Sequence, residues 1–445
     1  MKKILLILGF VLVFSSFVSS ADWDITKGTP LEFDTVNGAD NSLVKINSTH
    51  YINAYAGDGS DGFAVVLTVD GTTITKGTSY EFATIKGESH SLVQIDNTHY
   101  LNTYYGYVGN LGGFAVVLTV DGTTITKGTP LNFDLKASQN SLVKINSTHY
   151  INAYAGDGDD GFAVVLTVDG TTINKGTAFE FDTTYGKFNS LVQINNTHFL
   201  NTYSNTGGQA VILYVNDTTI TNITSFEFDS GSNQYNSLIK IDNTHYLNLY
   251  QNTSSVGYAV VLTIDGNTIS KGTAFKFTDF VGSVISPVQI NSTHYIISYT
   301  GLDGDGYTVV LNIDNTTITK NTNLEFDTNR AYSNSLVQIN DSHYLNTYAG
   351  IDNHGYAVVL EVEVPPTDTC TYSGTGDWNI LISDNCTITE DVDLGANTLL
   401  INGTNGLLSI QAEVKANKIQ FKPSVFDGTF KVSMKVGVGM LMGHI

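Results

Sequence analysis

The chain has 445 residues, with 42 Asp and Glu against 21 Lys and Arg, so its formal net charge is −21 and its pI is near 4.6. Such an acidic surface, with Arg330 as the single arginine, repels phosphate backbones and excludes nucleic-acid binding. Aromatic residues make up 11% of the chain and charged residues only 14%. This composition favours strands and tight turns and predicts an all-β protein.

The N-terminus has the pattern of an export signal. Lys2 and Lys3 precede an apolar stretch, Ile4 to Val13, and small residues follow at Ser19-Ser20-Ala21. Residues 1–21 are therefore predicted to be a cleaved signal peptide; the alternative is an N-terminal anchor that stays uncut. No later stretch reaches the roughly 18 to 20 apolar residues of a membrane span, so none is expected after the signal peptide. The protein is expected to be secreted or at the cell surface.

The next 340 or so residues repeat with a period typical of propeller blades. A histidine, preceded by Thr or Ser and followed by Tyr or Phe, recurs at intervals of 47 to 50 residues, at His50, His99, His149, His198, His245, His294 and His343. Each copy contains four short extended segments, and Asp-Gly turns such as Asp70-Gly71 join the last two as a hairpin. Seven such copies predict a seven-bladed β-propeller over residues 22–364, with four antiparallel strands in each blade.

The two ends of the repeat region are offset by one strand. A fourth-strand segment stands alone at Ile25 to Phe33, and the last copy stops after its third strand, Tyr356 to Val362. The N-terminal strand is therefore predicted to complete the last blade and close the ring, which leaves no unpaired sheet edge there.

Two aromatic positions repeat in every copy and are predicted to pack between blades. One is a phenylalanine at the end of the fourth strand: Phe33, Phe82, Phe133, Phe181, Phe228, Phe277 and Phe326. The other is a tyrosine on the second strand: Tyr55, Tyr104, Tyr154, Tyr203, Tyr250, Tyr299 and Tyr348.

The segment from Tyr154 to Phe181 shows the repeat most clearly: a tyrosine, a Gly-rich loop, Gly-Phe-Ala-Val-Val-Leu-Thr-Val, a Gly-Thr-Thr-Ile turn, Gly-Thr and Phe. Over residues 25–364 the chain resembles a family of secreted or surface propeller proteins whose activity is not settled. It lacks the Gly-His and Trp-Asp pair of WD40 blades, and one arginine cannot form the cluster that sialidases use. The resemblance implies a surface protein and names no reaction.

A second unit follows the polar linker 365–369 and spans residues 370–445. Its opening, Cys370-Thr371-Tyr372-Ser373-Gly374-Thr375-Gly376-Asp377-Trp378, resembles a module of archaeal surface proteins, which implies a small β-helix-like fold. A disulfide between Cys370 and Cys386 is expected in an exported chain; two free thiols are the alternative. The module ends without a capping segment, so it is either incomplete or docks surface-layer neighbours.

Loops that differ between copies emerge on one face of the expected ring, and variable loops on a rigid scaffold commonly bind ligands. Exposed aromatic side chains there suit sugar rings or a protein partner. The candidates are Tyr105, Tyr107, Tyr185, Phe188, Tyr235, Phe280 and Tyr332. The alternative is loop drift without a ligand.

Three Asp-Gly loops concentrate carboxylates, which are the ligands calcium prefers. The candidate calcium ligands are Asp58, Asp61, Asp157, Asp159, Asp160, Asp303 and Asp305. Hairpin turns select the same residues on conformational grounds, and none of the loops has a full calcium-binding pattern. The repeated histidines follow polar turns and are expected to bond to those turns rather than to bind a metal.

Asn-x-Ser/Thr sequences permit N-glycosylation of an exported chain, although turn preference alone explains several of them. They begin at Asn47, Asn146, Asn195, Asn216, Asn222, Asn252, Asn291, Asn315, Asn340, Asn385 and Asn402.

The sequence therefore predicts an extracellular or cell-surface binding or adhesion protein that presents the variable face to glycan or protein ligands. It contains no Gly-x-Ser-x-Gly elbow and no Ser/His/Asp set that departs from the repeat, so catalysis and a cofactor other than calcium are not expected. Two alternatives are a glycan-processing enzyme with a carboxylate pair on that face and a structural surface-layer component.

Overall fold

The computed structural model describes residues 23–107, 111–231, 233–282, 284–363, 370–372, 374–381, 386–402, 408–410, 412, 414–422 and 432–434. Within it, Trp23–Glu363 forms one compact unit, and the residues from Val364 onward belong to another. The predicted signal peptide 1–21 and the predicted linker 365–369 lie outside the described residues.

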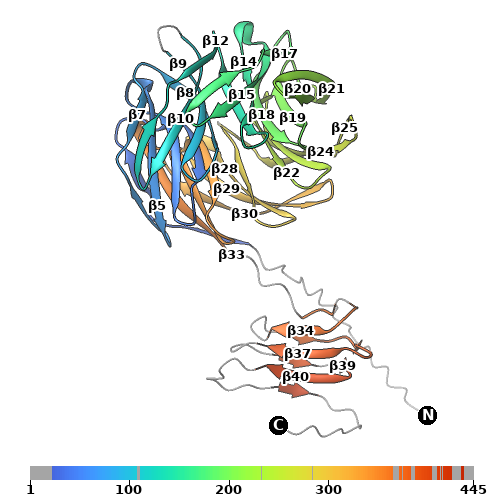
Figure 1. The fold of residues 1–445 in the computed structure, drawn as a ribbon. Helices are drawn as coiled ribbons and strands as arrows, with labels where there is room; N and C mark the ends of the chain where they lie inside the picture. The colour runs from blue at the N-terminus through green and yellow to red at the C-terminus, as the bar shows by residue number, and fades with distance from the viewer. Residues whose placement is uncertain are drawn as a thin grey trace, which may run out of the picture. The chain divides into compact units, whose positions relative to one another are not determined.

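The first unit is a ring of seven antiparallel sheets, which Figure 1 shows in colours that run round the ring from blue to orange. Blade 1 contains β3 (Ala39–Lys45), β4 (His50–Ala56), β5 (Gly62–Asp70), β6 (Thr73–Lys76) and β7 (Tyr80–Ala83). Blade 2 contains β8 (Gly87–Gln94), β9 (His99–Tyr107), β10 (Leu111–Asp121), β11 (Thr124–Lys127) and β12 (Leu131–Asp134). Blade 3 contains β13 (Ser138–Lys144), β14 (His149–Ala155), β15 (Gly161–Asp169), β16 (Thr172–Lys175) and β17 (Phe179–Asp182).

The remaining blades follow the same order. Blade 4 contains β18 (Lys187–Gln193), β19 (His198–Ser204), β20 (Gly208–Asn216) and β21 (Thr219–Asp229). Blade 5 contains β22 (Asn233–Lys240), β23 (His245–Asn252), β24 (Gly257–Asp265), β25 (Thr268–Lys271) and β26 (Phe275–Thr278). Blade 6 contains β27 (Ser286–Gln289), β28 (His294–Thr300), β29 (Gly306–Asp314) and β30 (Thr317–Asp327). Blade 7 contains β31 (Tyr332–Gln338), β32 (His343–Ala349) and β33 (Gly355–Glu363), with β1 (Asp24–Lys27) and β2 (Leu31–Asp34). Four one-turn 3-10 segments lie in loops: η1 (Asp58–Ser60), η2 (Asp157–Asp159), η3 (Leu302–Gly304) and η4 (Ile351–Asn353).

The N-terminal strands close the ring, as the offset ends of the repeat predict. β1 and β2 both pair antiparallel with β33, with Ile25 opposite Val362 and Leu31 opposite Ala357. The seven-bladed propeller and its closure are therefore confirmed.

A glycine interrupts the outer strand in five blades and explains why that strand is split there. A Cβ on Gly176, for example, would lie 2.5 Å from the carbonyl oxygen of Thr218 in the next blade. Blades 4 and 6 have no glycine at this point, and their outer strands β21 and β30 run unbroken.

The repeated aromatic residues pack between neighbouring blades, as predicted. Each phenylalanine meets the tyrosine of the following blade edge-on, with ring centroids 5.0–5.5 Å apart at all seven interfaces. At five interfaces the tyrosine hydroxyl also donates to the aspartate that follows the phenylalanine; Tyr154 Oη lies 2.6 Å from Asp134 Oδ2. Ala83 and Thr278 replace that aspartate at the other two interfaces. The buried Tyr104 hydroxyl, next to Ala83, has no partner among the described residues.

This difference predicts unequal effects for one substitution at two equivalent positions. Tyr154→Phe should lower the free energy of unfolding by about 1.5–3 kcal/mol, because it leaves the Asp134 carboxylate without a donor. Tyr104→Phe should cost nothing, because it removes a hydroxyl that is buried without a partner. Urea unfolding of both variants measures the difference, and equal losses would contradict it.

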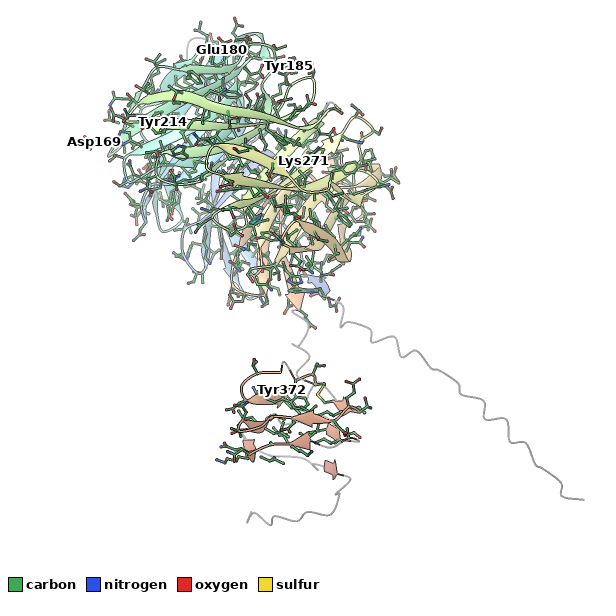
Figure 2. The ribbon with its side chains drawn as sticks, turned by 90° about the vertical axis from the view of Figure 1, so that its right-hand side faces the viewer. Asp169, Glu180, Tyr185, Tyr214, Lys271 and Tyr372 are labelled. Carbon is green, nitrogen blue, oxygen red and sulfur yellow. A yellow bond between two sulfur atoms is a disulfide. The ribbon has the colours of Figure 1, made fainter. Side chains whose placement is uncertain are left out.

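Two further sets of hydrogen bonds join the blades. At six of the seven interfaces, a serine hydroxyl on the first strand of one blade accepts the backbone N–H of a leucine on the first strand of the next blade. Ser335 Oγ, for example, accepts the Leu43 N–H. A lysine at the split of the outer strand donates to the carbonyl oxygen of the preceding blade's phenylalanine at five interfaces. These lysines are Lys27, Lys76, Lys127, Lys175 and Lys271, the last labelled in Figure 2.

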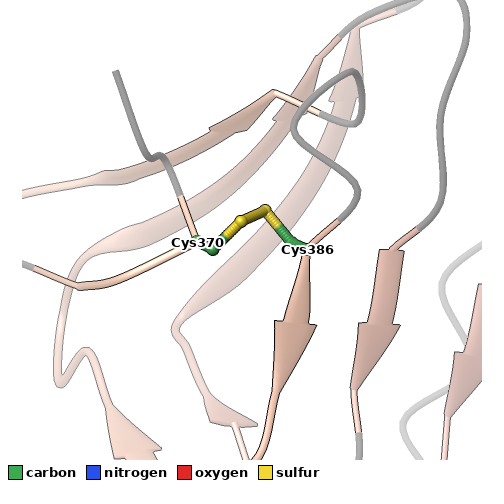
Figure 3. Close-up of a disulfide and its surroundings, with 2 residues drawn as sticks. All are labelled: Cys370 and Cys386. Atoms are coloured by element: carbon green, nitrogen blue, oxygen red, sulfur yellow. A yellow bond between two sulfur atoms is a disulfide. The ribbon is translucent and has the colours of Figure 1, made fainter. Parts of the chain in front are cut away.

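The C-terminal unit contains β34 (Trp378–Leu381), β35 (Thr387–Ile388), β36 (Val392–Asp393), β37 (Thr398–Asn402), β38 (Leu408–Ile410), β39 (Val414–Lys415), β40 (Lys418–Lys422) and β41 (Val432–Met434). All of its strand pairs are parallel, as expected for β-helix-like coils. The predicted disulfide joins Cys370 to Cys386 (Figure 3). Among the described residues, no helix is long and apolar enough to span a membrane.

Candidate functional site

The innermost strand of six blades contains a bulge at the same point, just inside its start. The residue there has a φ of 51–55° and is not glycine: Asp40, Ser89, Gln139, Phe188, Tyr235 and Ser333. The strand register shifts at each of these bulges. A left-handed backbone costs about 1–3 kcal/mol at a residue with a side chain and is often kept where a site needs it.

These six residues, with Val284 of blade 6, line one cavity of about 470 Å³ at the mouth of the propeller axis, here called the axial funnel. Four consecutive blades contribute a polar arc, which consists of Ser333, Asp40, Ser89 and Gln139. The other three blades contribute an apolar arc, which consists of Phe188, Tyr235 and Val284. A cavity of this size and mixed lining suits one small molecule that has both polar groups and an apolar face.

The next residue of each inner strand forms a floor of amides. In five blades it is an asparagine, and its Oδ1 accepts a hydrogen bond of 2.7–3.2 Å from an asparagine on the second strand: Asn41, Asn140, Asn189, Asn236 and Asn334. At four of these asparagines Nδ2 donates to a loop carbonyl, such as that of Gly38. Both ends of these four amides are thereby occupied, which fixes them in place, whereas the buried Asn236 Nδ2 has no partner among the described residues.

His90 takes the place of this asparagine in blade 2. Its Nε2 lies 2.9 Å from the Gly87 carbonyl oxygen, and its Nδ1 lies 3.2 Å from Nδ2 of Asn102. Burial lowers the pKa of His90 to about 4, so the ring is neutral at pH 7. A neutral ring protonated on Nε2 repeats the donor and acceptor of the amide, so His90 is a structural residue and not a free base.

Blade 6 breaks the floor differently. Ile285 and Ile297 replace the two asparagines and are buried, so the floor is apolar directly below Val284. The apolar arc therefore continues inward from the mouth.

Asp40 is the one carboxyl group that lines the funnel. Its Oδ2 accepts the Ser89 N–H at 3.0 Å, and no described residue donates to its Oδ1. Burial raises the pKa of Asp40 above its ordinary value, opposed by the Ser89 N–H and by the charge of Lys86. A desolvated carboxyl with one free oxygen in a cavity has the properties of a general base.

Two of the seven predicted aromatic ligand residues meet in the funnel. Phe188 and Tyr235 lie edge to face with ring centroids 5.0 Å apart. Burial raises the pKa of Tyr235, and the phenol of Tyr332 adds to the shift. Tyr332 itself does not line the funnel.

The other predicted aromatic residues are dispersed. Lys86 lies over the Tyr105 ring, Lys187 lies over the Tyr185 ring, labelled in Figure 2, and Arg330 lies over the Tyr332 ring, at 4.6–4.9 Å. Tyr107 ends β9, and Phe280 lines a separate pocket between blades 5 and 6.

The acidic loops form the one-turn segments η1, η2 and η3 and the residues just after them. In η2 the Asp159 carboxylate is already paired, with Lys136 at 2.7 Å and Lys187 at 2.6 Å. The described residues contain no group of three His, Cys, Asp or Glu side chains placed to hold a metal ion. Calcium binding by these loops stays a prediction.

The repeated histidines bond to their turns. Asn47 Oδ1 accepts the His50 N–H at 3.0 Å, and Thr49 Oγ1 lies 2.9 Å from His50 Nδ1; the other copies repeat this pattern. Candidate glycosylation residues are exposed at Asn47, Asn146, Asn195, Asn216, Asn222, Asn291, Asn315 and Asn340 and partly buried at Asn252. Asn385 lies outside the described residues, as does the side chain of Asn402, and glycosylation stays a prediction.

Sequence reasoning missed Asp40, Ser89, Gln139, Val284 and Ser333. Four of them lie in a strand rather than in a variable loop, and Val284 lies two residues before β27. One signal in the sequence could have found them. When the seven copies are aligned, the position of Asp40 differs in nearly every copy, while the next position is asparagine in five of the seven.

No family model matches the chain, and no curated protein matches it in sequence. Solved structures share its fold. The periplasmic gluconolactonase of Pseudomonas aeruginosa has a TM-score of 0.51 at 10% identity, over 65% of this chain and 86% of that one. A Bacteroides fragilis protein provisionally described as a 6-phosphogluconolactonase has a TM-score of 0.50 at 10% identity, over 65% and 85%. A Bacteroides uniformis protein with the same description has a TM-score of 0.50 at 9% identity, over 64% and 85%.

These neighbours correct the predicted function. The sequence predicted a binding or adhesion protein with a broad variable face and no catalysis, whereas the neighbours described by activity are lactonases. The physical reason for the error is the dispersal of the predicted aromatic residues: three of the seven lie against cations in separate blades, and the cavity lies at the axis instead. The alternative of a carboxylate pair on the variable face has no counterpart in the funnel, where Asp40 is the one carboxyl group among the described lining residues.

Proposed function

We propose that the chain is a lactonase-type hydrolase that opens small polyhydroxylated lactones in the axial funnel, with Asp40 as the general base. The observation that carries the proposal is the partly buried Asp40 carboxyl, bonded through one oxygen to the Ser89 N–H, in a cavity that has an aromatic wall. The descriptions of the structural neighbours supply the reaction class.

The proposed reaction needs one proton relay. The Asp40 carboxylate takes a proton from a water molecule, whose oxygen attacks the lactone carbonyl carbon. The tetrahedral intermediate collapses, the bond to the ring oxygen breaks, and that oxygen receives the proton from Asp40. Water and lactone thus give one hydroxy acid, and the carboxylate is regenerated.

The funnel lining favours an uncharged substrate. Asp40 is negative when it acts as a base, and none of the lining residues is Lys or Arg. Lys86, which acts on Asp40 electrostatically, is bound to Glu88 at 3.1 Å and lies over Tyr105. A phosphorylated lactone would therefore meet a carboxylate without a cation to balance its charge. The hydroxyl groups of a neutral sugar lactone match the Ser and Gln side chains, and its C–H face matches Phe188 and Tyr235.

We also infer that the protein acts outside the cytoplasm. The predicted signal peptide 1–21 and the Cys370–Cys386 disulfide support this location, since disulfides persist in oxidising compartments. The β-helix-like unit, with its resemblance to surface-protein modules, is a candidate for contacts with surface-layer neighbours.

Acid release from gluconolactone, measured with a pH indicator against spontaneous hydrolysis in the same buffer, tests the function. We expect acceleration in the exported fraction of an expressing culture, and a kcat/KM at least about 10-fold higher for gluconolactone than for its 6-phosphate, since one unbalanced charge contact is worth about 1.4 kcal/mol or more. A rate equal to the spontaneous rate with both substrates would overturn the proposal.

A further inference from the structure

The interface between blades 5 and 6 lacks three bonds, each of which forms at five or more of the six other interfaces. Pro287 has no N–H to donate to the serine of blade 5. Thr278 replaces the aspartate that binds the inter-blade tyrosine, and Tyr299 meets its hydroxyl instead. Lys320, which stands at the lysine position of the outer strand, does not bind the Phe277 carbonyl oxygen as its five equivalents bind theirs.

A cavity of about 520 Å³, here called the seam pocket, opens at this interface. Phe280 and Tyr307 give it aromatic walls, and Thr278, Asn323 and Lys320 are its polar lining. The neighbouring charges at the rim, Lys276 and Asp279, are paired with each other.

Lys320 is consequently a cation without a partner among the described residues. Partial desolvation lowers its pKa, although the residue as a whole is exposed, and Asp279 only partly offsets this. An unpaired, partly desolvated ammonium is stabilised by an anion placed beside it.

The equivalent pocket between blades 2 and 3 shows what differs. It has a volume of about 400 Å³ and is lined by Phe133, Asp134 and Lys175. There Lys175 Nζ is bound to the Phe133 carbonyl oxygen at 2.7 Å, and the Asp134 carboxylate adds negative charge. In the seam pocket Thr278 stands in place of that aspartate and the lysine is released, while the remaining lining carboxylate, Asp279, is paired with Lys276.

We propose that the seam pocket binds a small organic monocarboxylate with a flat apolar body, whose carboxylate pairs with Lys320 and whose ring lies against Phe280 and Tyr307. A single unpaired cation matches a monoanion rather than a phosphate. The aromatic walls match a ring, and the cavity volume is within the range of small-molecule sites.

Isothermal titration calorimetry of the full chain with benzoate tests this site. Benzamide serves as the neutral probe of the same shape. We expect saturable benzoate binding and affinity at least about 10-fold weaker for benzamide, because one charge-assisted contact is lost. Lys320→Met should reduce benzoate affinity to the benzamide level and leave the melting temperature and lactone turnover unchanged.

Lys175→Met is the matched control. It should leave benzoate affinity unchanged and lower the melting temperature, because it breaks the bond to Phe133. Absence of benzoate binding to the unmodified chain, or equal binding to the Lys320→Met variant, would overturn the proposal. Neither result bears on lactone hydrolysis in the axial funnel.

Discussion

Asp40→Asn is expected to reduce kcat/KM for gluconolactone by about 10²–10⁴-fold, the usual contribution of a general base. An amide cannot take a proton from water, but it should preserve the local structure. Gln139 provides the precedent: its Oε1 accepts the Phe188 N–H at 2.9 Å in the same way that Asp40 accepts the Ser89 N–H. Asp58→Asn, which removes an exposed carboxylate in η1, is the control and should leave the rate unchanged.

The same variant should be more stable than the parent protein at pH 7. The pKa of Asp40 is raised in the folded state, so the folded protein binds its proton more tightly than the unfolded chain does. Stability from this group is therefore greatest at low pH and is lost as the pH rises through the raised pKa. Asparagine carries no such penalty, so its advantage should appear at pH 7 and vanish below about pH 4, the ordinary range for an aspartic acid.

Unfolding curves at several pH values, together with the pH profile of kcat/KM in the parent protein, separate the two roles. A general base predicts a rate that falls as the pH drops through the raised pKa of Asp40, and a variant that is inactive but stabilised. An inactive variant that is also less stable would show instead that Asp40 holds the funnel in shape.

Removal of the closing strands should have the largest effect on stability. A chain that begins at Thr35 loses β1, β2 and the buried side chains of Trp23, Ile25 and Phe33. At about 1.5–3 kcal/mol for each large apolar side chain, the loss is on the order of 5–9 kcal/mol, comparable to the whole stability of many proteins. We expect the truncated chain to lose its cooperative thermal transition, as measured by circular dichroism.

A synthetic peptide of residues 23–34 is the control for this truncation. If the edge of β33 is otherwise intact, the peptide should add as a strand and restore part of the transition. A truncated chain that melts at the parent temperature would show that β1 and β2 do not hold the ring together.

The repeat made most of the fold predictable. Turn residues such as Asp70-Gly71 mark the hairpins, the Phe and Tyr positions report identical packing in each blade, and the offset of Ile25–Phe33 reveals the closure. The parallel pairing of β34, β37 and β40 followed from the resemblance of the Cys370 segment. The split of the outer strands was not predicted, because it depends on how closely Gly176 and its equivalents approach the next blade.

The funnel was harder to predict because its residues come from seven blades and depend on a backbone distortion. Simple alternation along a strand does not show that a bulge with a φ near 51° turns Asp40 toward the axis. Phe188 and Tyr235 were found because they are aromatic and differ from their equivalents, whereas Ser89 and Gln139 carry no such mark. Residues distant in the sequence also meet here: the Ser89 N–H donates to Asp40 Oδ2, and the Ser333 carbonyl oxygen accepts from Asn41 Nδ2.

Ring closure also sets the order in which the protein can mature during synthesis. The first strands to be made, β1 and β2, have no partner until the last propeller strand, β33, has been translated. Asp40 lies at the start of the next strand, β3, and its neighbour Asn41 donates to the Ser333 carbonyl oxygen at 3.3 Å. A nascent chain therefore has no complete funnel, and a product cut short by an early stop codon or by a protease lacks the wall beside Asp40. Hydrolysis would be confined to molecules that had been translated through blade 7.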